Sequence, residues 1–414
     1  MTFVGEAVFY IFSFLAVYMQ VFFLVTFLEN KEKMVTRRRE LKLREYPSVT
    51  IIVPCWNEEK TVEKTVNSLL KLNYPKEKLY LTLINDGSTD NTLEVLQKFS
   101  GYKNIKIFTK ENGGKHTALN FGIENSDTEF IGCLDADSIV DREALLRIMD
   151  CFKKDSELMA VTPSIIVNDP KNFIQKAQSF EHFITVFIRK IHGLLGAMTV
   201  LPGPFSIYKK RVFDELGLFR EAYNLEDTEI AYRMQKHRYK IDDCHDAYVY
   251  TNMPATIPKL YRQRLRWIYG IINNMIDYRS LILNKKYGDF SLLVVPANIL
   301  FMFSALYAFF IGVYNLADFV ISNILKWKLT SFTFVSHFGH WGTFFIPTNS
   351  SLIILLLLYG FIILTSAFGR KIVENKWVFS FDVFYFFLVF TFVSPFWLLR
   401  AVYNTLISKK PAWR

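Results

Sequence analysis

The chain has 414 residues and a formal net charge of +10, and 51% of its residues are hydrophobic. Its positive mean hydropathy argues against a purely soluble enzyme. A content of 21% charged residues is, in turn, too high for a chain that lies wholly in a membrane. The composition therefore predicts one soluble domain with membrane segments attached.

Residues 7–28 form the first predicted element, an uncharged stretch long enough to cross a bilayer core of about 30 Å. Glu6 precedes the stretch and a basic cluster follows it, which is the reverse of a cleavable signal peptide. The cluster contains Lys31, Lys33, Arg37, Arg38, Arg39, Lys42 and Arg44. By the positive-inside rule we expect a transmembrane helix within 1–30, its N-terminus outside, and a cytoplasmic basic juxtamembrane segment at 31–46.

The charge distribution also indicates the kind of partner. A basic chain can bind nucleic acid, anionic lipid or a phosphate-bearing substrate. Basic residues beside an apolar span favour the lipid bilayer, and the sequence has no stripe of basic and aromatic residues to suggest nucleic acid. The four cysteines, Cys55, Cys133, Cys151 and Cys244, have no CxxC spacing, which fits a reducing compartment rather than a zinc or disulfide framework.

Residues 47–254 alternate between short β-branched runs and amphipathic helical patterns. We predict strands at 49–53, 79–84, 105–108 and 130–134, and helices at 58–71, 89–99 and 115–124. This alternation is typical of βαβ units, in which a parallel sheet is covered on both faces. Ligands in such sheets bind at the carboxyl ends of the strands, and each polar motif described below follows a predicted strand or opens a helix. The pattern predicts an α/β domain with one binding crevice.

The remaining chain returns to the membrane. Residues 255–288 are amphipathic, basic and rich in aromatic residues, as expected for helices in the membrane interface. The region 289–414 contains three apolar stretches, at 291–317, 351–369 and 378–399. A third span would place the C-terminus outside, although the tail carries Arg400, Lys409, Lys410 and Arg414. A re-entrant last stretch and an exception to the charge rule both remain open.

Two motifs after the first two predicted strands can bind a nucleoside. Pro54, Asn57 and Glu58 follow the first strand, where their polar groups can hydrogen-bond a base or ribose. Asp86, in the sequence Asn-Asp-Gly-Ser, can accept hydrogen bonds from a uracil ring NH or a ribose hydroxyl. Simple helix capping or a turn explains each motif equally well on its own.

Lys115 follows the pair Gly113–Gly114 and supplies a positive charge for phosphate. The spacing matches neither the GxxxxGK[ST] loop nor the GxGxxG fingerprint. A solvated lysine after a glycine loop is the alternative.

Asp135 and Asp137 close the fourth apolar run. In a strand, residues i and i+2 share a face, and two carboxylates on one face favour a cation between them. Mg²⁺ or Mn²⁺ held by one or two carboxylates and substrate phosphates fits this pair. A solvent-exposed strand end is the alternative.

Two further motifs complete the set. Glu226–Asp227 opens a predicted helix, where a carboxylate can act as general base toward a sugar hydroxyl. Gln263, Arg266 and Trp267 fall at i, i+3 and i+4, so they share one helical face that suits diphosphate and a sugar ring. Interfacial anchoring is the alternative for this second group.

In this order the motifs resemble those of processive, membrane-integrated family 2 glycosyltransferases, which include poly-N-acetylglucosamine, chitin-oligosaccharide, hyaluronan and cellulose synthases. The similarity covers about residues 48–270. It implies that Asp86 contacts uracil, that Asp137 with Asp135 binds metal, and that Asp227 is the catalytic base. It assigns substrate binding to Pro54, Asn57, Glu58, Lys115, Asp135, Glu226, Gln263, Arg266 and Trp267. Asn85 and Leu225 depart from the family pattern, and residues 203–210 resemble its acceptor-side loop.

The resemblance implies a GT-A (Rossmann-like) α/β fold and an inverting enzyme that polymerises, and exports, a β-linked glycan from a UDP-sugar. Overall similarity favours UDP-N-acetylglucosamine. The expected cofactor is Mg²⁺ or Mn²⁺, and the expected partners are the donor, the growing glycan, the bilayer and a small membrane subunit. We expect a multi-pass protein of the plasma membrane with a cytoplasmic catalytic domain. The alternatives are a non-processive enzyme that adds one sugar to a lipid, and a transporter with a nucleotide-sensing domain.

Overall fold

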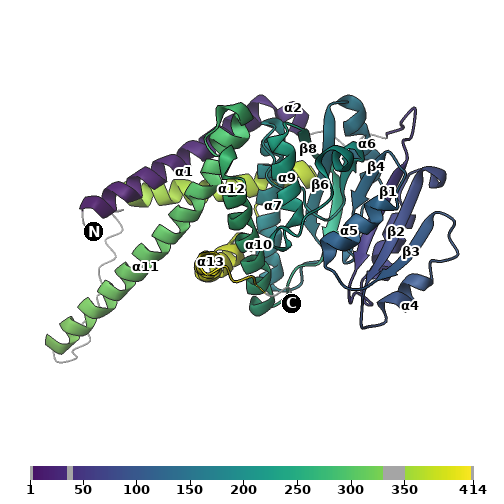
Figure 1. Ribbon diagram of the computed structural model, residues 1–414. Helices are drawn as coiled ribbons and strands as arrows, with labels where there is room; N and C mark the ends of the chain where they lie inside the picture. The colour runs from purple at the N-terminus through teal and green to yellow at the C-terminus, as the bar shows by residue number, and fades with distance from the viewer. Residues whose placement is uncertain (1–2, 35–40, 330–349, 412–414) are drawn as a thin grey trace. The chain divides into compact units, whose positions relative to one another are not determined.

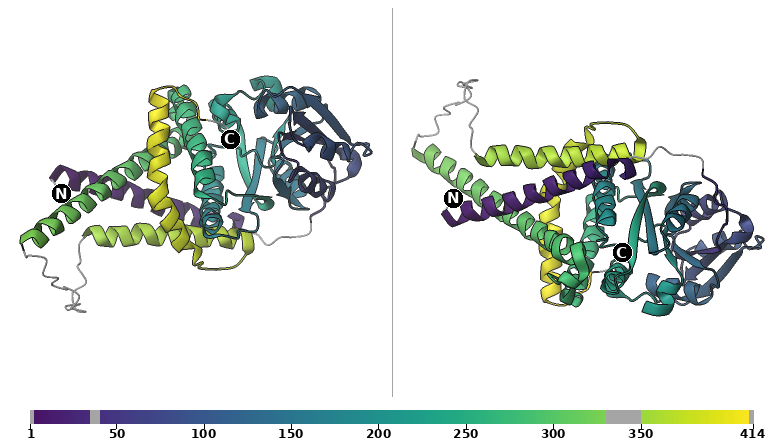
Figure 2. Two further views of the ribbon diagram at one scale, coloured as in Figure 1. Left: turned by 90° about the horizontal axis from the view of Figure 1, so that it is seen from below. Right: turned by 90° about the horizontal axis from the view of Figure 1, so that it is seen from above.

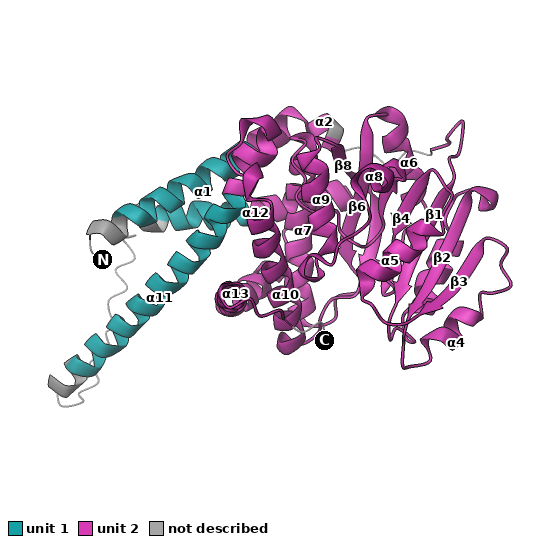
Figure 3. Ribbon diagram, viewed as in Figure 1, with its two compact units in different colours: residues 1–22, 297–362 teal, residues 23–296, 363–414 magenta. Residues whose placement is uncertain are grey.

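The computed structural model describes residues 3–34, 41–329 and 350–411 (Figure 1). These residues divide into two compact units, one formed by 1–22 and 297–362 and the other by 23–296 and 363–414 (Figure 3). Arg37, Arg38 and Arg39 of the expected basic cluster, and Arg414 of the tail, lie outside the described residues.

Four helices are long and apolar enough to span a membrane, at Ala7–Glu29, Phe290–Leu325, Ile353–Glu374 and Asp382–Leu406. They coincide with the four predicted apolar stretches. The helices of the first unit are the first part of α1 (Phe3–Glu29) and most of α11 (Val295–Leu329) and α12 (Ser350–Glu374). Phe14, Phe303 and Phe310 in this unit are exposed. Such large exposed apolar side chains are expected where a helix faces lipid rather than water.

The second unit is built on one sheet of eight strands in the order β3-β2-β1-β4-β7-β6-β8-β5. Strands β3, β2, β1 and β4 are parallel, as predicted. The other half is mixed, because β7 runs antiparallel to both β4 and β6, and β5 antiparallel to β8. The strands are β1 (Val49–Cys55), β2 (Leu79–Asp86), β3 (Ile105–Lys110), β4 (Phe130–Cys133), β5 (Ser138–Val140), β6 (Leu158–Val167), β7 (Ser206–Lys209) and β8 (Lys240–Thr251).

Hydrophobic residues are buried on both faces of this sheet. Ile51 belongs to one core cluster and its neighbour Ile52 to the other, because successive strand residues point to opposite faces. The helices of the domain are α3 (Val62–Leu70), α4 (Thr92–Gln97), α5 (Lys115–Glu124), α6 (Ala144–Lys154), α7 (Phe173–Leu194), α8 (Arg211–Leu216) and α9 (Glu226–Lys236). A sheet buried on both faces leaves the loops at its strand ends as the place for polar chemistry.

Two predicted helices begin later than expected. The prediction of 58–71 becomes α3 at Val62–Leu70, and 89–99 becomes α4 at Thr92–Gln97, whereas 115–124 is confirmed as α5. Hydrogen bonds join the segment 57–59 to the segment 88–92. The backbone amides of Asn57, Glu58 and Thr89 donate to side chains of the other segment, so both helices begin after these residues.

Three helices pack together on one side of the second unit. α13 (Asp382–Leu406) lies beside α10 (Ile257–Asp277), as both views of Figure 2 show, and also contacts α7. Phe180 of α7 packs on Phe386 of α13 with ring centroids 5.1 Å apart. The side chain of Asn273 in α10 donates to Thr405 Oγ1 at 3.1 Å. The last apolar helix is therefore joined to the amphipathic helix along its length.

Candidate active site

The carboxyl ends of β1, β2, β3 and β4 meet at one edge of the sheet, where the predicted motifs gather. Asp86 ends β2 and stands in register with Lys110 at the end of β3. The Lys110 ammonium donates to Asp86 Oδ1 at 2.7 Å. The backbone amides of Gly113 and Gly114 donate to Oδ1 at 3.2 Å and Oδ2 at 3.1 Å. The Asp86 carboxylate thus fixes the glycine loop that precedes Lys115.

The loops after β1 and β2 are joined by side-chain bonds. Asn57, with a positive φ of 56°, accepts a bond from the Thr89 amide at 2.8 Å through its side-chain oxygen. The amide of Glu58 donates to Thr92 Oγ1 at 2.8 Å. Asn57 does not cap the following helix, since α3 begins only at Val62. Pro54 lies within β1, in register with Ile84. These two loops are therefore held together at the carboxyl ends of β1 and β2.

Asp135 and Asp137 lie in a turn between β4 and β5, because β4 ends at Cys133. The prediction that a strand places both on one face is therefore wrong, and the turn presents them instead, closed by the Ser138 amide that donates to the Asp135 carbonyl at 3.1 Å. Burial raises the pKa of Asp137 to about 7, helped by the charges of Asp135 and Glu58. A carboxylate in this setting gains from a bound cation.

Lys115 connects the aspartate turn to α9. Its Nζ lies 2.7 Å from Asp135 Oδ1 and 3.1 Å from Glu226 Oε1. Burial alone would lower the pKa of Lys115, but Asp135, Glu226 and Asp227 raise it well above its ordinary value. The lysine therefore stays charged and holds carboxylates from two parts of the chain together.

Glu226 and Asp227 are the first residues of α9, where the helix dipole favours negative charge. Burial opposes the charge on Glu226, yet Lys115, a backbone amide and Arg266 lower its pKa. Burial raises the pKa of Asp227 to about 7, and the neighbouring Glu226 charge raises it further. Two adjacent carboxyl groups thus have pKa values pushed apart, a pattern typical of acid–base sites.

The loop before β7 approaches this cluster closely at Gly203. A Cβ atom there would collide with Lys115 Nζ and with Oδ1 of Asp135, 2.9 Å away. A larger residue at position 203 would displace the charged ends of Lys115 and Asp135. The segment 203–210, which we expected on the acceptor side, therefore begins against the charged cluster.

The motif Gln263, Arg266 and Trp267 lies on α10. Arg266 lowers the pKa of Glu226, so its charge reaches the cluster. The side-chain oxygen of Gln263 is buried and has no hydrogen-bond partner among the described residues. Trp267 is half-buried, and the guanidinium of Arg264 lies 4.5 Å from its ring centroid. Among the described residues, neither Gln263 nor Trp267 makes a hydrogen bond or ion pair with the charged cluster.

Comparison with protein families gives the identity of the domain. Residues 50–217 match the family model Glycosyl transferase family 2. Residues 50–217 form a glycosyltransferase family 2 domain. The matched residues contain all the strand-end motifs from Pro54 to Asp137.

The glycosyltransferase is similar to named relatives. It is 29% identical over 307 residues to a poly-beta-1,6-N-acetyl-D-glucosamine synthase of Staphylococcus epidermidis, covering 69% of this chain and 74% of the relative. A synthase of the same name from Staphylococcus aureus is 30% identical over 254 residues, 61% of each chain. A mannosyltransferase from Pyrobaculum calidifontis, solved with GDP-Man and Mn²⁺, has a TM-score of 0.60 at 14% identity, covering 97% of this chain and 99% of that one. The last likeness confirms the GT-A-like fold.

Two carboxylates of the glycosyltransferase, Asp135 and Asp137, are the candidate ligands for a divalent metal ion. Within the residues that the structure describes, no three His, Cys, Asp or Glu side chains gather into a self-sufficient metal site. Asp137 and Asp135 supply hard oxygen donors, and burial, together with the negative charges of Asp135 and Glu58, raises the pKa of Asp137. Mg²⁺ and Mn²⁺ commonly take only one or two protein carboxylates and complete their shell with phosphate and water. The residues fit such an ion.

Two residues that shape the site of the glycosyltransferase were not predicted from the sequence. Lys110 pairs with Asp86, and Arg264 lies over the Trp267 ring while pairing with Glu181 at 2.6 Å. Strand register could have suggested Lys110, since both residues end neighbouring parallel strands. Arg264 stands inside the Gln-x-x-Arg-Trp motif but gave no separate signal.

Proposed function

We propose that the protein transfers N-acetylglucosamine from its UDP donor to the end of a growing β-1,6-linked glycan. The cluster of Lys115, Asp135, Glu226 and Asp227 at the strand ends carries this proposal, because it combines a fixed cation with a carboxyl group of raised pKa. The relatives named for poly-β-1,6-N-acetylglucosamine synthesis support the choice of sugar and linkage.

The nucleoside is proposed to bind between the first two loops. The Asp86 carboxylate already accepts three bonds, two at Oδ1 and one at Oδ2. A carboxylate has about four acceptor positions, so Oδ2 keeps one for a uracil ring NH. The Asn57 side chain and the Glu58 carboxylate would line the same pocket, beside Pro54.

Asp227 is proposed as the general base that removes the proton from the acceptor hydroxyl as its oxygen attacks the anomeric carbon. The C–O bond to the diphosphate breaks on the opposite face, which inverts the configuration. Lys115 and Arg266 would stabilise negative charge that develops on the leaving diphosphate. A divalent metal on Asp137 and Asp135, when bound, would supply further neutralisation of that charge.

The acceptor is proposed to lie against α10. Gln263 has a buried oxygen that an acceptor hydroxyl could satisfy. The Trp267 ring, oriented by Arg264, offers a surface on which a sugar ring can stack.

A donor screen with product mass analysis tests the proposal. Purified full-length protein in lipid nanodiscs, supplied with UDP-N-acetylglucosamine and Mn²⁺, is expected to release UDP and form products spaced by one N-acetylhexosamine residue. Chemical linkage analysis should give β-1,6 bonds. A product with one sugar on a lipid would support the lipid-acceptor alternative and overturn polymerisation, and activity only with another nucleotide sugar would overturn the donor.

We further propose that α13 lies along the membrane surface and that the C-terminus is on the side of the catalytic domain. Tyr385, near the start of α13, packs on Phe173 of α7 with ring centroids 6.4 Å apart. Thr405, at the other end, bonds Asn273. A helix of 25 residues is about 37 Å long. The contacts at both ends of α13 with α7 and α10 support a placement beside the catalytic domain rather than across the bilayer.

A single added cysteine after Arg414 tests this placement. In sealed inside-out vesicles, a membrane-impermeant maleimide is expected to label it as readily as a cysteine on exposed Lys106 of the catalytic domain. Labelling only from the opposite side, in right-side-out vesicles, would show that α13 crosses the membrane.

A further inference from the structure

The segment 220–225, which we call the strap, immediately precedes Glu226 and Asp227. Three successive residues in it, Ala222, Tyr223 and Asn224, have φ values of 43°, 60° and 61°. Left-handed backbone is unfavourable for residues other than glycine, and a run of three persists only where surrounding contacts hold it. The contacts that hold the strap therefore matter for the residues that follow.

The strap is fixed at both of its ends. Before it, the Asn120 side chain of α5 exchanges two bonds of 2.9 Å with the backbone of Phe219. At its other end, Leu225, the last residue of the strap, packs against Gly270 of α10. A Cβ atom on Gly270 would lie only 2.8 Å from the Leu225 Cβ. Leu225 thus contributes packing at a position where the family commonly has a threonine, and it leads directly into α9.

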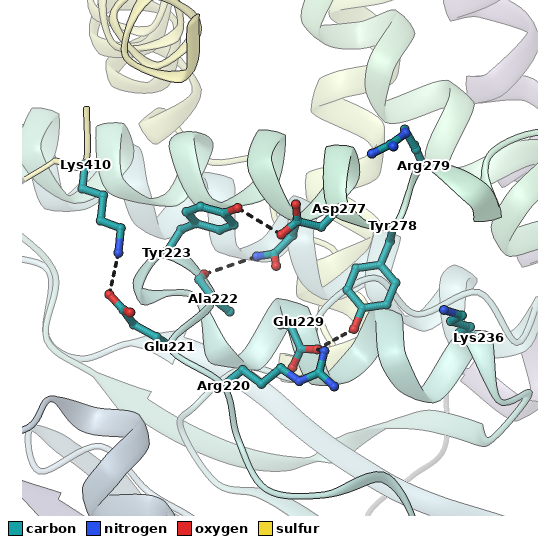
Figure 4. Close-up of a pocket in the computed structure, with 11 residues that line it drawn as sticks. Arg220, Glu221, Ala222, Tyr223, Glu229, Lys236, Asp277, Tyr278, Arg279 and Lys410 are labelled. Carbon is teal, nitrogen blue, oxygen red and sulfur yellow. Dashed lines mark hydrogen bonds and ion pairs between the residues drawn. The ribbon is translucent and has the colours of Figure 1, made fainter. Parts of the chain in front are cut away.

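The middle of the strap is held by α10 and by the C-terminal tail (Figure 4). The Tyr223 hydroxyl donates to Asp277 Oδ2 at 3.0 Å. The Asn274 side chain, which is buried, reaches the Ala222 carbonyl at 3.5 Å. Lys410 Nζ pairs with Glu221 Oε1 at 2.8 Å. These contacts surround a cavity of about 560 Å³.

The tail reaches the strap because α13 ends in a tight turn. Ser408 has a φ of 54°, its amide bonds the Thr405 carbonyl at 3.2 Å, and the Lys409 amide bonds the Asn404 carbonyl at 2.9 Å. This is the Schellman arrangement, which reverses the chain direction at a helix end. After the turn, Lys410 pairs with Glu221 on the surface of the protein.

We propose that Lys410 of the tail and Asp277 of α10 are positioning residues, which hold the strap so that Asp227 stands where its carboxylate meets the acceptor hydroxyl. This inference rests on the proposed function for the role of Asp227. It makes the C-terminal tail, 183 residues away in sequence, part of the machinery that sets the geometry of transfer.

Hydrogen exchange on the full-length protein tests the contact without requiring activity. Lys410→Ala is expected to speed exchange about threefold in the peptide that covers 219–227, because the amides of Asn224 and Leu225 bond within the strap. Lys409→Ala is the matched control, since it removes the same charge from the neighbouring residue. Unchanged exchange in Lys410→Ala would overturn the proposal.

Transfer kinetics with UDP-N-acetylglucosamine test the consequence. Lys410→Ala is expected to lower kcat about threefold, and Lys410→Ala combined with Asp277→Ala on the order of tenfold, with KM for the donor unchanged. Lys410→Arg should retain wild-type kcat, and the exchange Glu221→Lys with Lys410→Glu should restore it.

The outcomes separate this inference from the proposed function. Faster exchange with an unchanged kcat would overturn the positioning role. A change in KM for the donor with kcat unchanged would point to a role in donor binding and would also overturn the positioning role. Full transfer activity in Asp227→Asn would instead refute the base assigned in the proposed function, while the exchange data would still decide whether the tail holds the strap.

Discussion

Asp227→Asn is expected to lower kcat for glycosyl transfer by about 10³-fold while the affinity for UDP stays nearly unchanged. The amide keeps the shape of the side chain but cannot accept the acceptor proton. In the proposed binding mode the nucleotide contacts the loops around Asp86 and Lys115, and the ion pairs of Lys115 with Asp135 and Glu226 do not involve Asp227. Release of UDP from labelled donor and calorimetric titration with UDP measure the two quantities.

Asp214→Asn, on the exposed surface of α8, serves as the matched control and should behave as wild type. A variant at Asp227 that loses UDP binding together with activity would contradict the role of a general base. Residual transfer near the wild-type rate would have the same meaning.

The pH profile provides a second expected result for the same residue. Because the pKa of Asp227 is raised to about 7, the carboxylate is protonated and inactive below that pH and is competent above it. We therefore expect kcat to rise with pH through about 7 and to level off. Burial also raises the pKa of Asp137 to about 7. The two residues can be distinguished, because a pH dependence of kcat due to Asp137 should shift when the Mn²⁺ concentration is changed, and one due to Asp227 should not.

Asp137→Asn is expected to reduce transfer on the order of a hundredfold and to weaken the Mn²⁺ dependence of UDP binding. The Asp137 carboxylate lies near the negative charges of Asp135 and Glu58. Its negative charge is therefore unfavourable for folding but favourable for binding a cation. Chelation of divalent ions should lower wild-type activity to a similar degree. Initial rates against Mn²⁺ concentration, with UDP titrations at each concentration, measure the effect.

Thermal unfolding in the presence of a chelator is the control for Asp137→Asn. Since the environment disfavours the charged carboxylate, the variant should unfold at a temperature no lower than wild type. A wild-type metal requirement in the variant would assign the ion to other residues. Asp227→Asn, in contrast, should keep the metal dependence of UDP binding.

Comparison of prediction and structure shows where local patterns were sufficient. The apolar stretches and the strands β1 to β4 were predicted because burial leaves a periodic trace in the sequence. The helix 58–71 was placed too early because the Glu58 amide bonds the side chain of Thr92, the first residue of α4. The strand argument for Asp135 and Asp137 failed because β4 ends at Cys133, and a turn presents these two side chains.

The chemical groups at the strand ends, and their order, could be predicted from the sequence, because each motif directly follows its strand in the chain. Which of these groups contact one another is visible only in the folded structure. Lys115 pairs with Glu226, 111 residues away, and Lys410 with Glu221, 189 residues away. Such contacts depend on which strands are neighbours and on how α13 packs, and no local periodicity records the packing of distant elements.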